Sequence, residues 1–156
     1  MTKIPFVGLH AHSGLSLNDG LGYPQDHMDF AYENGGDALA LTDHGHMNGL
    51  PYQVLHARKM KANGKNFKPI FGVEAYFNPS LEQWREEYEK AKQEKKKGIK
   101  NEIELSIEDE RASKQKVVDI LKKRNHLILI AQNQIGLNNI FKLVSESYKD
   151  ENFYRY

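Results

Sequence analysis

Two histidines separated by one residue, His10 and His12, lie in the segment GLHAHSG near the start of the chain. The apolar run PFVGLH leads into them and predicts a short strand that ends at His10. Because residues i and i+2 of an extended segment point to the same face, both imidazoles can direct a ring nitrogen toward one point. This spacing is typical of a divalent metal site, and the alternative is a pair of solvated loop histidines.

A second polar group, LTDHGHMNG, follows directly after the apolar segment ALALT. Asp43 and His44 place a carboxylate beside an imidazole, which can act as a ligand and its orienting partner. Taken alone, such a pair after a strand is more often a turn or capping device. These residues alone therefore leave both roles open.

Glu74 stands in the otherwise apolar segment FGVEAYF, which predicts a core strand. A buried carboxylate is costly unless it is paired or bound to a metal. The chain has no cysteine, which excludes disulfides, thiolate metal clusters and cysteine nucleophiles. The three segments together predict a metal site with nitrogen and oxygen ligands that holds more than one ion.

The elements that must position these residues alternate between strands and helices. Besides the run that ends at His10, the patterns predict strands over residues 38–42, 68–77 and 126–132, and helices over residues 24–34, 51–63 and 135–148. This alternation favours a parallel α/β fold, in which functional residues collect beyond the carboxyl ends of the strands. His10 and His44 fit that expectation because each lies at the end of a predicted strand.

Residues 81–125 interrupt the alternation with a charged interval, in which Glu recurs three or four residues from Lys or Arg. We predict a charged helical insertion made of two helices that separate near Gly98. Its charges are of mixed sign, which favours a solvated surface over an arm that contacts DNA.

Composition narrows the class of protein. The 156 residues suffice for one domain with a hydrophobic core. The formal net charge of +1 gives the chain no overall positive field of the kind that favours nucleic-acid binding. No apolar run reaches the length of a membrane span, and the N-terminal run is too short for a secretory signal. We expect a cytoplasmic protein with no membrane partner.

Four segments taken in order resemble the signature blocks of the PHP (polymerase and histidinol phosphatase) domain: LHAHSGLSLNDG, ALTDHGHMNG, KPIFGVEAYF and HLILIAQNQIGLNNIFKLVSESY. The blocks GVEAY and GLNNIFKLVS favour the form found at the N-terminus of the bacterial DNA polymerase III alpha subunit. The resemblance implies an α/β fold that is the N-terminal part of a distorted (β/α)7 PHP barrel. The family carries further ligands downstream, including an Asp-x-His pair, so we expect residues 1–156 to be a PHP domain that is incomplete at the C-terminus.

The resemblance also implies which residues form the site. The implied metal ligands are His10, His12, Asp19, His44, Glu74 and His126. Of these, His10, His12 and Glu74 are implied to be catalytic, with Glu74 as a bridging carboxylate. His126 opens a predicted strand, which is the wrong end for a barrel mouth unless the strand boundary is displaced or the chain bends there.

Four other polar residues have lesser expected roles. Asp43 is expected to orient a ligand. His46 departs from the amide that the family usually carries, and we expect it beside the site or incidental to it. His27 and His56 lie in predicted helices and are expected at the surface or in helix packing.

The implied activity is metal-dependent 3′→5′ removal of nucleotides in a replicative polymerase, with zinc, manganese or iron as the divalent metal and up to three ions in the complete domain. The implied partners are DNA, the remainder of the polymerase chain or a second polypeptide that completes the barrel, and other replisome subunits. The alternative is a catalytically silent PHP module that stabilises the polymerase and docks an exonuclease. A histidinol-phosphate type of phosphatase is disfavoured by the polymerase-type blocks.

Overall fold

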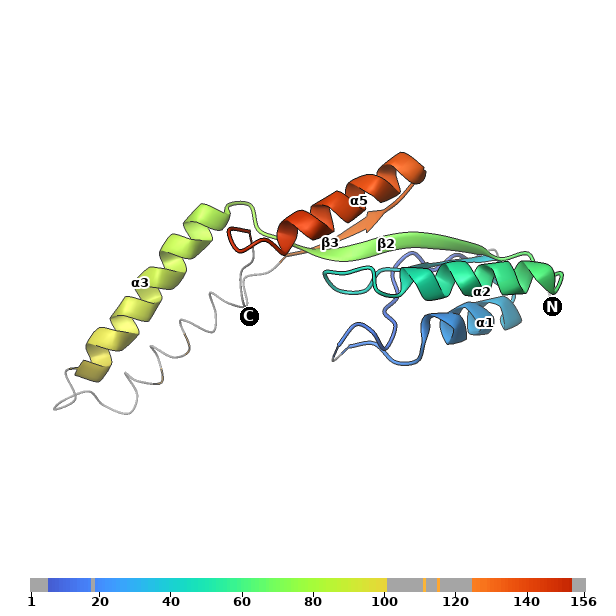
Figure 1. Cartoon of the computed structure of the whole chain (residues 1–156). Coiled ribbons are helices and arrows are strands. Elements are labelled where there is room, and N and C mark those ends of the chain that lie inside the picture. Colours follow the sequence, from blue (N-terminus) through green and yellow to red (C-terminus); the bar gives the residue numbers. More distant parts are fainter. Residues whose placement is uncertain (1–5, 18, 101–110, 112–114, 116–124, 153–156) are drawn as a thin grey trace. The chain divides into compact units, whose positions relative to one another are not determined.

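The computed structural model describes residues 6–17, 19–100, 111, 115 and 125–152 (Figure 1). The chain divides into two compact units, of which the first is Met1–Tyr76 with His126–Asp150 and the second is Phe77–Asn125 with Glu151–Tyr156. All residues singled out above for chemistry belong to the first unit.

A three-stranded sheet forms the centre of the first unit. Its strands are β1 (Ala38–Leu41), β2 (Lys68–Phe77) and β3 (Asn125–Ile130), in the order β1-β2-β3. β1 and β2 run parallel, and their register places Leu41 beside Phe71. The parallel pairing expected for these two strands is therefore confirmed.

The N-terminal segment runs along the other edge of β1. Gly8 forms a parallel bridge with Leu39, and the N–H groups of Ala40 and Thr42 donate to the carbonyls of Gly8 and Ala11, each at 2.8 Å. The strand predicted here is thus reduced to an isolated bridge. The segment nevertheless lies extended beside β1 up to the pair of histidines.

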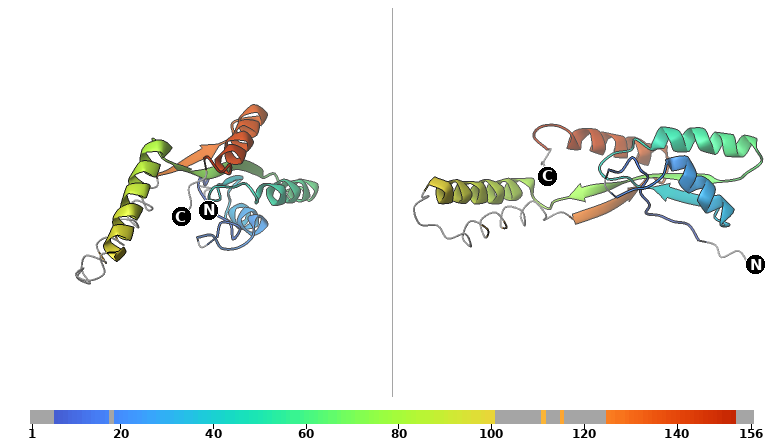
Figure 2. Two further views of the ribbon diagram at one scale, coloured as in Figure 1. Left: turned by 60° about the vertical axis from the view of Figure 1, so that its left-hand side comes forward. Right: turned by 90° about the horizontal axis from the view of Figure 1, so that it is seen from below.

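β3 runs antiparallel to β2, which differs from the all-parallel sheet that the alternation predicted. The Ala131 N–H donates to the Phe71 carbonyl at 2.9 Å, while the Leu129 carbonyl lies over Gly72, so residue numbers rise along one strand as they fall along the other. The strand arrows in Figures 1 and 2 show the same opposed directions. The start of β3 therefore lies at the carboxyl end of β2, which resolves the position of His126 without any change of strand boundary or bend.

Gly72 permits the close approach of β3 to β2. A Cβ atom at this position would lie 2.6 Å from the Leu129 carbonyl oxygen and 2.9 Å from a methyl group of Thr42. Both distances are shorter than the contacts that a Cβ atom makes with other heavy atoms, so this position requires glycine.

Three helices accompany the sheet: α1 (Pro24–Glu33), α2 (Leu50–Ala62) and α5 (Gln134–Ser147). Pro24 begins α1 and Pro51 lies in the first turn of α2, positions where the missing proline N–H is not needed. Asn133 caps α5 because its side-chain oxygen accepts the Gly136 N–H at 2.9 Å. These starts agree within a residue with those expected from the sequence.

The core of the first unit lies between α1, α2 and the beginning of the sheet. Met28 of α1, Met60 of α2 and Phe67 are buried together, with Leu39 of β1 packed against them. Figure 2 shows α1 and α2 beside one another in both views. This packing supports one end of β1, while the far end leads into the segment Asp43–His44.

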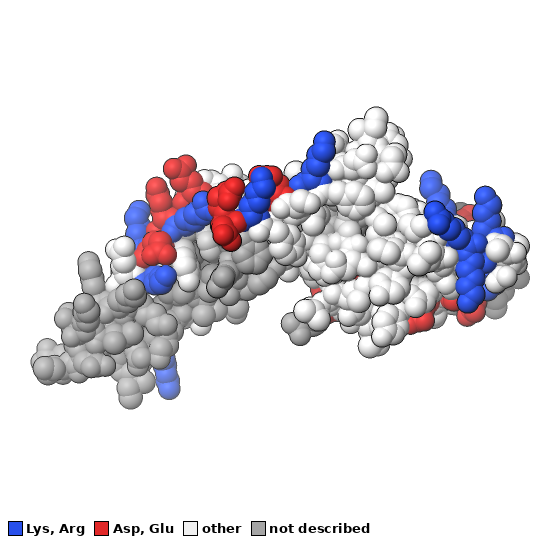
Figure 3. Space-filling model, in the orientation of Figure 1, with Lys and Arg blue, Asp and Glu red and all other residues white. Residues whose placement is uncertain are grey.

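The second unit contains α3 (Leu81–Lys100), whose last described turn includes Gly98, the residue near which we expected two helices to separate. Trp84 and Ala91 are buried, and the Trp84 ring stacks on that of Tyr88 with centroids 5.3 Å apart. Figure 3 shows acidic and basic side chains interspersed over the described part of α3. The second helix expected in the interval falls almost entirely outside the described residues.

The expected α/β class is confirmed, because helices alternate with strands along the chain and β1 pairs with β2 in parallel. Among the helices that the structure describes, none has both the length and the apolar character needed to cross a bilayer.

Candidate metal centre

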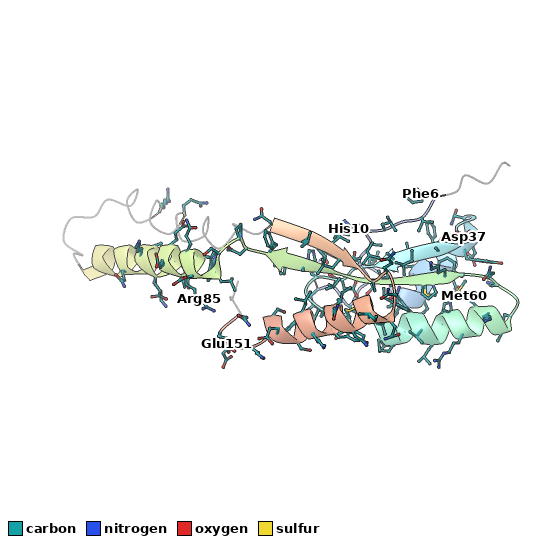
Figure 4. The ribbon with its side chains drawn as sticks, turned by 90° about the horizontal axis from the view of Figure 1, so that it is seen from above. Phe6, His10, Asp37, Met60, Arg85 and Glu151 are labelled. Carbon is teal, nitrogen blue, oxygen red and sulfur yellow. The ribbon has the colours of Figure 1, made fainter. Side chains whose placement is uncertain are left out.

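The extended segment beside β1 presents His10 and His12 to the same point, as their spacing predicts. Their Nε2 atoms lie 3.0 Å apart, and both approach one oxygen of Glu74, at 2.9 Å from His10 and 2.5 Å from His12. Figure 4 shows His10 at the side of the strands. Two imidazole nitrogens that face one another need a proton or a cation between them, so this geometry suits a shared positive charge.

Glu74 lies in β2 and is 2 % exposed, so its carboxylate has lost nearly all contact with water. Its place is fixed by the backbone, because Glu74 N–H donates to the Asp43 carbonyl at 3.1 Å and its carbonyl accepts the Gly45 N–H at 2.8 Å. Gly45 adopts a φ of 69° in this turn, a conformation that favours glycine. The turn after β1 and the glutamate of β2 are thereby locked together.

Asp19 and His44 complete the side of the site near the turn. The Asp19 carboxylate lies 2.9 Å from His12 Nδ1 and also contacts His44 Nε2. The His44 N–H donates to the Ser16 hydroxyl at 3.1 Å, which fastens the loop that carries Asp19 to the end of β1. Each ring nitrogen of His12 therefore faces a carboxylate.

His126 reaches the site from the start of β3. Its Nδ1 lies 2.5 Å from the second oxygen of Glu74, Oε1. The antiparallel direction of β3 places this residue at the same end of the sheet as His44, which follows β1. The structure thus brings together all six residues that the resemblance implied, and their role as ligands stays a prediction.

Three overlapping groups within this cluster could each hold a metal ion, since their ligand atoms lie within 4.8 Å of one another: His10 with His12 and Glu74; His12 with Asp19 and His44; and His44 with Glu74 and His126. His12, His44 and Glu74 each belong to two groups. Shared ligands imply neighbouring ions, so the arrangement suits a polynuclear centre of the kind that the sequence predicts.

Both carboxylates are held in their ionised form. Burial by itself raises the pKa of Glu74, but hydrogen bonds from His10 and His126 and the other nearby imidazoles outweigh burial and lower that pKa below its usual value. Burial acts in the same sense on Asp19, whose pKa is nevertheless lowered by its hydrogen bond with Ser16 and by the imidazoles beside it. Two anions among four imidazoles form a suitable donor set for divalent cations.

A buried hydrogen-bonded pair, Ser13 with Asp43, joins the two segments that carry His12 and His44. The Asp43 carboxylate accepts the Ser13 N–H at 2.7 Å and the Ser13 hydroxyl at 2.9 Å, and both residues are buried. Ser13 follows His12 in the chain and Asp43 precedes His44. The pair therefore ties together two segments that each carry a ligand, which accords with the orienting role expected for Asp43.

The other histidines contact neither the carboxylates nor the imidazoles of the centre in the described part of the chain. His46 Nε2 lies 3.1 Å from the Leu15 carbonyl, His27 Nε2 lies 2.6 Å from the Leu21 carbonyl, and His56 pairs with Asp29 at 2.9 Å. His56 thus links α2 to α1, as a packing residue does.

Sequence reasoning missed Tyr76, which lies two residues after Glu74 on β2. Its ring stacks on His44 with centroids 5.3 Å apart and meets the edge of His126 at 5.2 Å. The two-residue spacing from Glu74 was the available signal, because it places both side chains on one face of the strand.

Comparison with known proteins shows the family of this chain. The profile of the family described as the PHP domain matches residues 8–156, and the chain belongs to this family. Among curated proteins it is 30 % identical over 155 residues to the DNA polymerase III subunit alpha of Treponema pallidum, and 32 % identical over 150 residues to that of Borreliella burgdorferi. The matches cover 99 % and 96 % of this chain but 10 % of each relative, so the chain spans about a tenth of the length of these relatives.

A solved structure of a protein assigned as a metal-dependent phosphoesterase, from Bifidobacterium adolescentis, is similar over 96 % of this chain and 56 % of its own, with a TM-score of 0.39 at 13 % identity.

Proposed function

We propose that this chain is the N-terminal PHP-domain portion of a replicative DNA polymerase of the DNA polymerase III alpha type, with a polynuclear metal site that hydrolyses phosphodiester bonds from the 3′ end. One observation carries the proposal. The Glu74 carboxylate is surrounded by imidazoles from His10, His12 and His126 within 2.9 Å, with His44 Nε2 at 3.6 Å. Four histidines around one buried anion are more than an ion pair requires.

The residues fit a metal centre on their chemistry. Neutral imidazole and carboxylate oxygen suit zinc, manganese and iron alike, and thiolate ligands are absent because the chain has no cysteine. We propose up to three ions in the complete domain, and the three overlapping ligand groups of this chain support that proposal. Metal identity is a further part of the proposal, and we expect it to follow availability among these three metals.

Exposure suggests how a substrate would approach. The side chains of His10 and His126 are 51 % and 48 % exposed, whereas that of Glu74 is 3 % exposed. Glu74 therefore forms the floor of the site, and a phosphodiester would enter from the side of the two open imidazoles. Bound divalent metals would supply a water of lowered pKa and stabilise the charge that develops on the phosphate and on the leaving oxygen. Asp19 and Glu74, ionised at neutral pH, orient the imidazoles and balance the positive charge.

The polymerase context sets the proposed partners. The relatives are subunits of a DNA polymerase and extend far beyond the matched region. We propose DNA as the substrate, the remainder of the polymerase chain or a second polypeptide as the part that completes the barrel, and other replisome subunits as further partners. A replicative function places the chain in the cytoplasm.

The test combines metal content with hydrolysis. The purified chain is loaded with Mn²⁺, Zn²⁺ or Fe²⁺, its bound metal is measured, and a 5′-labelled single-stranded DNA is followed for stepwise shortening from its 3′ end. We expect Glu74→Gln and His12→Ala to lower both bound metal and hydrolysis. His27→Ala, which removes an imidazole outside the centre, is the matched control and should change neither.

Two other outcomes have defined meanings. Metal binding without hydrolysis, both in this chain alone and in this chain combined with the part that completes the barrel, would favour the alternative of a structural PHP module that docks an exonuclease. Bound metal that is unchanged in Glu74→Gln and His12→Ala would contradict the metal centre itself.

A further inference from the structure

Three aromatic rings meet at the edge of the candidate metal centre. The Tyr76 ring lies parallel to that of His44, with an interplanar angle of 7° and centroids 5.3 Å apart, and perpendicular to that of His126, at 82° and 5.2 Å. The two imidazoles also meet each other edge to face, with centroids 5.1 Å apart. Tyr76 therefore contacts both histidines of the group that they form with Glu74.

The two imidazoles come from separate segments of the chain. His44 follows β1, and His126 begins β3. The terminal torsion of a histidine side chain is broad, so the backbone alone does not fix the plane of the ring. Among the residues that the structure describes, the polar contact of His126 is with Glu74, and its side chain is 48 % exposed. A rigid neighbour is needed to hold its ring in one plane.

Tyr76 is placed to be that neighbour. It stands two residues after Glu74 on β2, so the two side chains lie on the same face of the strand. The tyrosine side chain has only two torsions, so its ring is comparatively rigid. The ring lies flat against the imidazole of His44 and perpendicular to that of His126. One strand thus supplies both the shared carboxylate and the surface that orients the two imidazoles around it.

We propose that Tyr76 is a positioning residue that fixes the planes of the His44 and His126 imidazoles and so sets the metal affinity of the group formed by His44, Glu74 and His126. The inference rests on the proposed metal centre. It assigns the effect to the ring of Tyr76 and not to its hydroxyl group. Residues that orient metal-binding histidines typically change metal affinity by about 10- to 100-fold when they are removed.

The test is a Co²⁺ titration of the full chain, because the visible absorption of Co²⁺ reports the geometry of its ligands independently of activity. We expect Tyr76→Leu to weaken the affinity of one bound equivalent by about tenfold or more and to alter its absorption bands. Tyr76→Phe keeps the ring and should titrate as the wild type does. Tyr52→Leu makes the same change on α2, where Tyr52 is 46 % exposed, and serves as the matched control.

Each outcome separates this inference from the metal centre. A wild-type chain that binds no Co²⁺ would refute the proposed metal centre, whatever the variants do. Wild-type binding with an unchanged affinity and spectrum in a folded Tyr76→Leu would show that Tyr76 only packs, and would overturn the inference alone. A loss in Tyr76→Phe as large as in Tyr76→Leu would assign the effect to the hydroxyl and would also overturn it. If Tyr76→Leu does not fold, Tyr76→Met, whose unbranched and flexible side chain adapts better to an irregular gap, carries the same test.

Discussion

Replacement of Asp43 tests how the fold holds the two ligand-bearing segments together. The Asp43 carboxylate is buried and accepts two hydrogen bonds from Ser13, at 2.7 Å from its N–H and 2.9 Å from its hydroxyl. Hydrogen bonds to a charged group contribute about 1.5–3 kcal/mol each, and Asp43→Ala also leaves a buried N–H without its acceptor. We expect Asp43→Ala to lower the free energy of unfolding by about 3–5 kcal/mol. This is a large share of the 5–15 kcal/mol, roughly, that stabilises a typical domain.

Asp43→Asn provides the matched comparison. The amide oxygen can still accept the Ser13 N–H, and the amide N–H can donate to the Ser13 hydroxyl, so both contacts survive as neutral hydrogen bonds. The difference between charged and neutral hydrogen bonds is about 1 kcal/mol each, which predicts a loss of about 1–2 kcal/mol for Asp43→Asn.

Urea unfolding of the metal-free chain, followed by circular dichroism, measures these losses. A double-mutant cycle with Ser13→Ala isolates the pair, and we expect a coupling free energy of about 1–2 kcal/mol between the two positions. The reasoning is refuted if Asp43→Asn costs as much as Asp43→Ala, or if the coupling is smaller than about 0.5 kcal/mol.

Two further predictions follow from the carboxylates and from the glycine between the strands. Because the pKa values of Glu74 and Asp19 are lowered in the folded chain, the unfolded chain takes up their protons first. The stabilisation that these two carboxylates contribute to the metal-free protein is complete above their ordinary pKa values of 4.5 and 3.8 and is lost as the pH falls below them. Urea midpoints measured against pH should show this slope, and an equal slope in Glu74→Gln would contradict the assignment. Gly72→Ala should lower stability by about 1–3 kcal/mol, since its Cβ would lie 2.6 Å from a carbonyl of β3. Gly136→Ala, whose added Cβ would have its nearest neighbours at 3.7 Å, should be near neutral when both variants are unfolded in urea.

Local patterns in the sequence were sufficient to predict most elements. β2 has the predicted bounds, and the helix starts agree because Pro24 and Pro51 mark them. The direction of β3 was not predictable in this way. Strand direction depends on how residues 78–124 return the chain to the sheet, and an apolar run has the same period whichever way it points. The position of His126 held the clue, because its place at the start of a strand fits the site only if that strand is reversed.

The site shows the same division between local and distant information. His10 and His12 could be predicted from their spacing, and Glu74 from the cost of a buried charge. Asp19 and His126 came from the family resemblance, since neither stands in a pattern that indicates a ligand. The contacts of Ser13 with Asp43 and of Tyr76 with two histidines join segments far apart in the chain. Such pairs are created by the fold: the sequence places Tyr76 on the same face of a strand as Glu74, but it does not indicate which histidines Tyr76 contacts.

The central claim is that six residues hold divalent metal around Glu74, and metal content tests it most directly. Elemental mass spectrometry of the purified, folded chain after equilibration with Mn²⁺ or Zn²⁺ should find about two or more equivalents per chain. The same measurement should find markedly less in Glu74→Gln and the wild-type amount in His27→Ala. A folded wild-type chain that retains no metal, or a Glu74→Gln variant that retains as much as the wild type, would contradict the claim.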